Sequence, residues 1–305
     1  MDSLAAAPGT GPATSPLPVI RPVRVPRTFE ALPADRTVVM GILNVTPDSF
    51  SDGGKYSSTD DAIAHGLRML YAGADIIDVG GESTRPGAAA VPVEEELQRV
   101  LPVVRALVKA GALVSIDTMH PETAAQAVRA GAGIINDISG NGFDPDMPAL
   151  AAELGVPYIL THRRGTAETM DSLATYSNVV EEVIAELLEV RDTFVAAGVK
   201  PGNIILDPGL GFAKTGGHNW ELLRSLDRLG SLGHRVLIAA SRKRFLGTLL
   251  TSAGKPAVPA ERDAATLAVS ALAAANGAWA VRVHDVGPTL DAVKVASAWA
   301  GQGPR

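Results

Sequence analysis

Cysteine is absent from this chain of 305 residues. Its absence excludes a disulfide framework, a thiolate metal site and a cysteine nucleophile. No apolar run reaches the roughly 18 residues that span a bilayer. The N-terminus also lacks the basic segment and apolar core of a secretory signal. We therefore expect a cytoplasmic protein with no membrane partner.

Basic stretches and several familiar motifs are missing too. The formal net charge is −6 at pH 7, and no basic stripe is evident along the chain. Neutralising nucleic-acid phosphates requires such a stripe, so we expect no nucleic-acid partner. No His pair has the spacing of a zinc site, and no G-x-S-x-G elbow is present.

The N-terminal segment differs in composition from the rest of the chain. Residues 1–34 are rich in Ala, Pro, Gly, Ser and Thr. Such a segment cannot bury enough apolar surface to fold alone. We expect residues 1–34 to form a largely disordered tail and residues 35–305 to form one folded domain.

From residue 38 onward, short apolar runs alternate with longer amphipathic stretches. Unbroken apolar runs are typical of strands that are buried on both faces. Eight such units in about 265 residues predict a closed (β/α)8 TIM barrel. The alternative is a doubly wound open sheet, but no G-x-G-x-x-G follows the first strand. The predicted strands are residues 38–43, 75–79, 113–116, 133–135, 157–160, 204–206, 236–239 and 279–283. The predicted helices are residues 60–72, 94–110, 121–130, 147–154, 178–197, 218–229, 260–276 and 288–299.

Polar side chains stand at or near the ends of most predicted strands. In a barrel these ends face one side, where active sites are built. Taken singly, such residues have structural explanations, since Asp117 could cap the next helix and Asp207 could form a turn. Their recurrence favours a site, because buried charges must be paired or used. The residues are Asn44, Asp78, Asp117, Asn136, Asp207, Lys243, Arg282 and His284.

The chemistry of these side chains indicates a ligand class. Several Asp and Asn groups suit a flat polar heterocycle with an amidine-like edge. Lys243, Arg282 and His284 offer cationic donors for an anion such as a phosphate. The carboxamide of Asn44, beside phosphate oxygens, would complete a Mg²⁺ site. The predicted ligand is a polar ring joined to a phosphate ester.

Residues 40–54 read MGILNVTPDSFSDGG, and residues 80–87 read GGESTRPG. Both segments resemble the signatures of bacterial dihydropteroate synthases. Shorter motifs around Asp117, Asn136 and Asp207 follow in the family's order, as do Ser241-Arg242-Lys243 and Arg282-x-His284-Asp285. The resemblance implies a transferase that couples 6-hydroxymethyl-7,8-dihydropterin diphosphate to p-aminobenzoate. The products would be pyrophosphate and dihydropteroate, for folate synthesis.

The resemblance also implies roles for individual residues, a Mg²⁺ cofactor and a homodimer formed through the late barrel helices. Asp117, Asp207 and Lys243 would be catalytic and would hold the pterin ring together with Asn136, while Asp78 would support that pocket. The diphosphate would be bound by Asn44, Arg282 and His284, with Mg²⁺ beside Asn44. The p-aminobenzoate site would be shaped by Phe50, Thr84, Arg85, Pro86, Phe212 and Ser241.

Two rival interpretations remain open. A pterin-binding methyltransferase would share the ring-binding Asp and Asn positions. It would not need residues 83–87 or the pair formed by Arg282 and His284. A non-catalytic pterin-binding paralogue is favoured by Thr161 alone, because the family usually has Met at this position against the pterin pocket.

Overall fold

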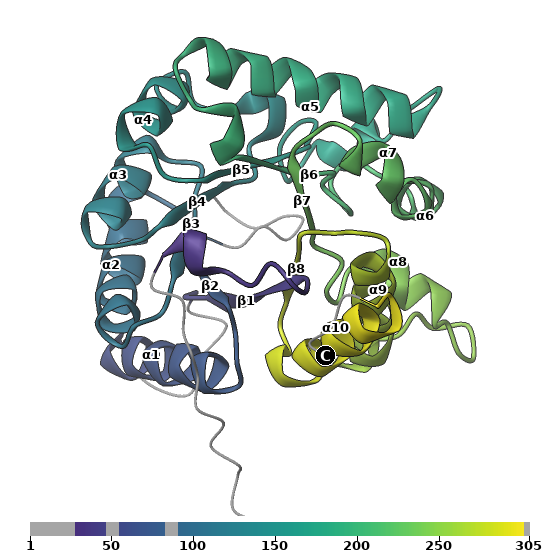
Figure 1. Cartoon of the computed structure of the whole chain (residues 1–305), viewed down its shortest axis with the longest axis horizontal. Helices are drawn as coiled ribbons and strands as arrows, with labels where there is room; N and C mark the ends of the chain where they lie inside the picture. The colour runs from purple at the N-terminus through teal and green to yellow at the C-terminus, as the bar shows by residue number, and fades with distance from the viewer. Residues whose placement is uncertain (1–27, 47–54, 83–90, 302–305) are drawn as a thin grey trace, which may run out of the picture.

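The computed structural model describes residues 28–46, 55–82 and 91–301. Its eight strands run parallel, each beside the next in sequence, and β8 pairs with β1 to close the barrel. Helices surround this barrel (Figure 1). The prediction of a (β/α)8 barrel is confirmed. The strands are β1 (Val38–Asn44), β2 (Ile76–Gly80), β3 (Val114–Asp117), β4 (Ile134–Asp137), β5 (Tyr158–Thr161), β6 (Ile204–Asp207), β7 (Arg235–Ile238) and β8 (Ala280–Val283).

The helices follow the predicted order with three differences. The helix expected over residues 218–229 is broken at Ser225, where φ is −110° and ψ is 30°. A six-residue helix after β7 was not predicted, because so short a segment shows no period. The first helix also begins at Lys55 rather than at residue 60. The helices are α1 (Lys55–Tyr71), α2 (Val93–Lys109), α3 (Pro121–Arg129), α4 (Met147–Leu154), α5 (Val179–Ala196), α6 (Gly216–Arg224), α7 (Leu226–Gly230), α8 (Arg244–Leu249), α9 (Asp263–Ala275) and α10 (Val286–Trp299).

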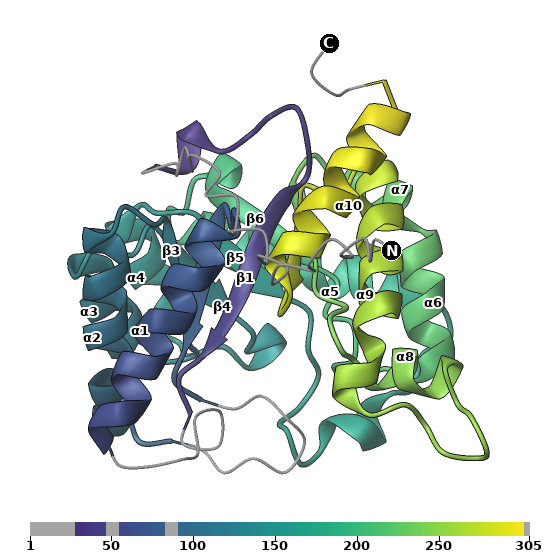
Figure 2. The same cartoon turned by 90° about the horizontal axis from the view of Figure 1, so that it is seen from below.

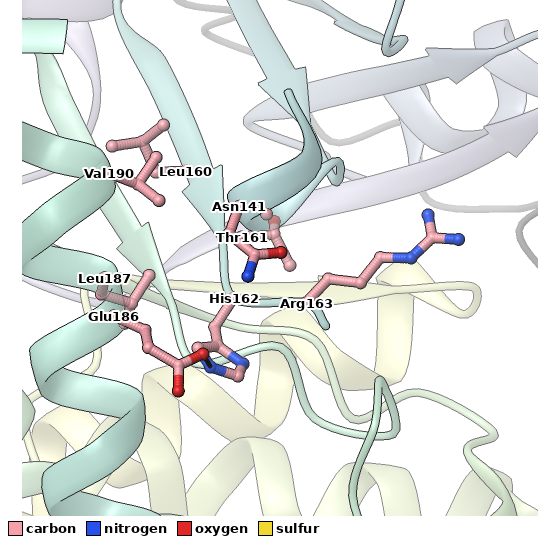
Figure 3. Close-up of a pocket in the computed structure, with 9 residues that line it drawn as sticks. Asn141, Leu160, Thr161, His162, Arg163, Glu186, Leu187 and Val190 are labelled. Carbon is pink, nitrogen blue, oxygen red and sulfur yellow. Dashed lines mark hydrogen bonds and ion pairs between the residues drawn. The ribbon is translucent and has the colours of Figure 1, made fainter. Parts of the chain in front are cut away.

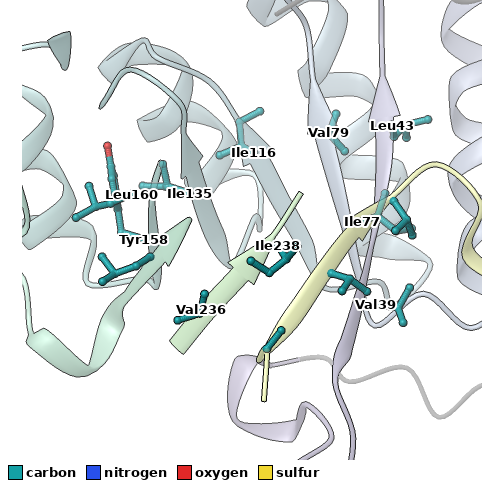
Figure 4. Close-up of a cluster of buried hydrophobic side chains, with 14 of the residues drawn as sticks. Val39, Leu43, Ile77, Val79, Ile116, Ile135, Tyr158, Leu160, Val236 and Ile238 are labelled. Atoms are coloured by element: carbon teal, nitrogen blue, oxygen red, sulfur yellow. The ribbon is translucent and has the colours of Figure 1, made fainter. Parts of the chain in front are cut away.

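Alternation along each strand divides the buried side chains into two sets. Outward-facing residues such as Val39, Ile77 and Tyr158 pack between the strands and the helices (Figure 4). Inward-facing residues fill one end of the barrel with a second apolar cluster, which we call the barrel floor. Successive side chains of a strand point to opposite faces, so the inward residue two positions further on lies above the floor. The floor comprises Val38, Met40, Ile76, Leu113, Ile134, Ile159, Ile205, Leu237, Ala239 and Ala280.

The chain enters the barrel at the floor end. The 3-10 helix η1 (Phe29–Ala31) lies at the end of the molecule opposite to the one where β1 finishes (Figure 2). The ring of Phe29 is 5.6 Å from that of Trp279, and the guanidinium of Arg235 stands 4.9 Å from the Phe29 ring. Residues 1–27 lie outside the described residues, so the expected tail stays a prediction. Among the described residues, no helix is both long and apolar enough to cross a membrane.

Candidate active site

The predicted strand-end residues lie at one end of the barrel, which we call the mouth. Strand register brings several of them side by side. Asp117 pairs with Asn136, and Thr161 pairs with Asp207. Four residues predicted at the p-aminobenzoate site lie outside the described residues, namely Phe50, Thr84, Arg85 and Pro86. The residues placed at the mouth are Asn44, Asp78, Asp117, Asn136, Asp207, Phe212, Ser241, Lys243, Arg282 and His284.

Arg282 joins carboxylates from different strands across the mouth. Its Nε donates to Asp78 Oδ2 at 2.6 Å and its Nη2 donates to Asp117 Oδ2 at 2.6 Å. Asn136 Nδ2 donates to the same oxygen of Asp78 at 2.9 Å. Asp78 is fully buried and Asp117 is 7% exposed. Arg282, expected at the diphosphate, therefore also contacts the acids expected around the pterin ring.

Burial moves the pKa values of three mouth residues, Asp117, Asp207 and Lys243, toward neutrality. It raises the pKa of Asp117 to about 7, an effect that the charge of Arg282 opposes and that of Asp78 reinforces. It raises the pKa of Asp207 in the same way, against the attraction of Lys243. For Lys243, burial lowers the pKa to about 8, against the attraction of Asp207. Groups with pKa values shifted in this way can gain or lose a proton near neutral pH when a ligand binds.

The side chain of Lys243 lies across the loop that follows β6. Its Nζ stands 4.3 Å from the centre of the Phe212 ring and donates to the carbonyl of Leu210. Gly211 makes this approach possible, because a Cβ there would come within 2.8 Å of Lys243 Cδ. Its φ of 81° also favours glycine. The loop thus sets an aromatic ring beside the ammonium group.

Ser241 and His284 are neighbours, although the resemblance assigned them to different subsites. Ser241 Oγ is 2.8 Å from His284 Nδ1, and the backbone N–H of His284 donates to Ser241 Oγ at 3.2 Å. Ser241 is 8% exposed. These contacts join the ends of β7 and β8, the second of which carries Arg282.

A buried polar network behind β5 was not predicted. Lys214 Nζ lies 2.8 Å from His162 Nδ1 and donates to the Phe212 carbonyl at 2.9 Å. His162 Nε2 lies 3.1 Å from Glu186 Oε2, and Figure 3 shows these two side chains turned toward each other. Burial and the charge of Lys214 lower the pKa of His162 to about 4. Lys214, in the segment after β6, is the sequence feature that pointed to this network. It was a weak signal, because its contact partner His162 lies 52 positions away in the sequence.

Comparison with known proteins identifies the family. A model described as "Pterin binding enzyme" matches residues 40–284. The dihydropteroate synthase of Mycobacterium leprae (strain TN) is 53% identical over 88% of this chain and 95% of its own length. The chain belongs to the dihydropteroate synthase family. The dihydropteroate synthase of Escherichia coli (strain K12) is 45% identical over 85% of this chain and 90% of its own length. As a member, the chain is a transferase of folate biosynthesis.

Solved dihydropteroate synthases share this fold. The enzyme of Xanthomonas albilineans with 4-aminobenzoic acid is 45% identical, with a TM-score of 0.80 over 87% of this chain and 93% of that one. The same enzyme with 7,8-dihydropteroate is 43% identical, with a TM-score of 0.79 over 88% of this chain and 95% of that one. The Yersinia pestis dihydropteroate synthase with a sulfonamide drug is 40% identical, with a TM-score of 0.82 over 88% of this chain and 96% of that one.

Proposed function

We propose that the mouth carries out the dihydropteroate synthase reaction by a dissociative route. The bond between the pterin methylene carbon and the diphosphate oxygen breaks, and pyrophosphate departs with the bonding electrons. The amine of p-aminobenzoate then bonds to that carbon and loses a proton. The observation that carries this proposal is the set of three buried carboxylates, Asp78, Asp117 and Asp207, around one barrel end. Buried carboxylates stabilise positive charge more strongly than carboxylates in water.

The mouth residues divide the work between the ring and the leaving group. We assign ring binding to Asp78 and Asn136, and stabilisation of the developing cation to Asp117 and Asp207. Fixed charges cost no reorganisation at the moment of reaction. The carboxylate contacts of Arg282 set its guanidinium beside the ring-binding acids. From there it can bridge to an anionic leaving group.

Lys243 and His284 supply further donors to the mouth. We assign the ammonium group of Lys243 to the pterin ring and to the charge of the departing pyrophosphate. His284, hydrogen-bonded to Ser241, is assigned to the diphosphate. Phe212 and Ser241 are assigned to the p-aminobenzoate site. The same assignment extends to Thr84 and Arg85.

Magnesium is proposed to arrive with the diphosphate. Within the described residues, no group of three His, Cys, Asp or Glu side chains could hold a metal ion. Asn44, at the end of β1, offers a single carboxamide oxygen. This sparse donor set fits Mg²⁺, which keeps several waters and takes substrate phosphate oxygens. When bound, Mg²⁺ would neutralise part of the charge of the leaving pyrophosphate.

Pyrophosphate release tests the proposed reaction. We expect release from the pterin diphosphate to require p-aminobenzoate, and a sulfonamide to compete with p-aminobenzoate. A methyltransferase would instead transfer a methyl group from methyltetrahydrofolate, and a non-catalytic paralogue would bind the pterin without turnover. Release that is absent, or that is independent of p-aminobenzoate, would contradict the proposal.

A homodimer through the late helices is also proposed. Large apolar side chains are exposed on the adjoining helices α9 and α10, with Leu272 at 64%, Val295 at 65% and Trp299 at 89% exposure. Exposed apolar groups gathered on neighbouring elements are typical of protein interfaces. This surface is where the family resemblance places the dimer contact.

Substituting Val295 tests the dimer. We expect Val295→Glu to shift the sedimentation coefficient from that of a dimer to that of a monomer, because it would bury a charge at the interface. Lys294→Gln, on the same helix, serves as the control because it lowers the net charge by the same one unit. If the parent protein sediments as a monomer at concentrations of tens of micromolar, the proposed dimer is wrong.

A further inference from the structure

The inward-facing side chain at the end of β5 has no hydrogen-bond partner among the residues that the structure describes. β5 places Ile159 in the barrel floor, so Thr161, two positions further on, faces the interior above it. Thr161 is 3% exposed, and its Oγ1 finds no hydrogen-bond partner among the described residues. Leaving a buried hydroxyl unpaired costs as much as losing a hydrogen bond. Such a group calls for a partner that the described part of the chain does not supply.

The neighbours of Thr161 are residues assigned to the pterin ring. Register places it beside Asp207 on β6, and Asn136 stands on β4, on the other side of β5. Oδ1 of Asn136 and Oδ1 of Asp78 are likewise buried without a partner within the described part of the chain. Unpaired polar atoms therefore recur along the inner wall between β2 and β5.

The unpaired atoms differ in what they can do. Oδ1 of Asn136 and the carboxylate oxygens can only accept hydrogen bonds. One of the two amide N–H groups of Asn136 is already donated to Asp78. A threonine hydroxyl can donate as well as accept. The hydroxyl of Ser115 on β3, which pairs with Asp78 in register, is also buried without a partner among the described residues. Thr161, beside Asp207 on the other side of Asn136, can likewise offer a proton to an acceptor atom of the ring.

We propose that Thr161 is a specificity-determining residue, whose hydroxyl donates a hydrogen bond to an acceptor on the heterocycle, either a ring nitrogen or a carbonyl oxygen. This inference rests on the proposed function. An apolar side chain at this position would contact the ring without forming a hydrogen bond to it, so it would not distinguish rings that differ in their acceptor atoms. With Thr161, a ring that lacks the acceptor leaves the hydroxyl unpaired and is rejected.

Direct binding of 6-hydroxymethylpterin, measured by titration calorimetry, tests this inference without requiring turnover. Thr161→Val keeps the shape and removes the hydroxyl, so we expect its Kd to rise about five- to tenfold. Thr161→Ser keeps the hydroxyl, and its Kd should stay within about twofold of the parent. Thr161→Val should not lower the melting temperature of the ligand-free protein, because the hydroxyl has no partner to lose in the described part of the structure.

The results separate this inference from the proposed function. Equal Kd values for Thr161→Val and the parent protein would overturn the inference while leaving the reaction intact. An increase in Kd of the same size in Thr161→Ser and Thr161→Val would also overturn it, because packing would then explain the loss. Absence of p-aminobenzoate-dependent pyrophosphate release from the parent protein would instead contradict the reaction.

Discussion

Asp117→Asn is expected to lower kcat/KM by about 10²- to 10³-fold, the loss typical when a fixed electrostatic group is removed from a transition state. The variant keeps the size of the side chain and can still contact Arg282, so the fold should survive. Initial rates of pyrophosphate release and a circular dichroism spectrum provide the measurement. Unchanged kcat/KM would remove Asp117 from the mechanism.

The pH profile gives a second measure of Asp117. Its pKa of about 7 means that the reactive carboxylate forms as pH rises through 7. Lys243, with a pKa of about 8, loses its charge as pH rises further. We expect kcat/KM to rise about tenfold per pH unit below 7 and to fall above 8. Asp117→Asn should lose the part of the rising limb that titrates near pH 7 and keep the falling limb.

A matched control lies on the next strand. Asp137 directly follows Asn136 but faces outward, where it accepts hydrogen bonds from Tyr158 at 2.6 Å and from the Ser139 backbone at 2.7 Å. Asp137→Asn should lower the melting temperature and leave kcat/KM within a few-fold of the parent. A loss as large as that of Asp117→Asn would show that charge near the mouth, rather than its position, governs the rate.

Arg282→Met is expected to destabilise the protein by about 3–5 kcal/mol, because two buried carboxylates would lose their shared cation. Asp78 is fully buried and Asp117 nearly so, and water cannot replace the guanidinium easily. The free energy of unfolding from urea titration provides the measurement. Turnover should be lost in the same variant.

The loss of stability should depend on pH. The raised pKa of Asp117 means that the folded protein holds a proton there which the unfolded chain releases near its ordinary pKa, close to 4. Without Arg282, that pKa rises further. The cost of the substitution should therefore be smaller at pH 6 than at pH 8. Adding Asp117→Asn should restore part of the stability, and a purely additive double variant would contradict the pairing.

The sequence predicted the barrel because its strands are unbroken apolar runs at regular spacing. It also predicted which residues stand at the mouth, since polar groups follow those runs directly. It did not predict α8, whose six residues are too few to show a period. The break at Ser225 was missed because the apolar spacing continues through Leu226 and Leu229.

Contacts between residues far apart in the chain could not be predicted from the sequence pattern. The approach of Lys214 to His162 depends on how two loops leave neighbouring strands. The contacts of Arg282 with Asp78 and Asp117 depend on strand order around the closed barrel, in which only β1 separates β8 from β2 and β3 follows β2. Sequence motifs named these residues, but only the fold shows that they touch.

The spacing of two residues between floor and mouth has an evolutionary consequence. Ile159 lies below Thr161, and Ile205 lies below Asp207. Strands β5 and β6 therefore each carry one codon that matters to thermal tolerance and, two codons later, another that matters to ligand choice. Descendants of this gene can acquire a new preference at the upper position while inheriting the lower one unchanged.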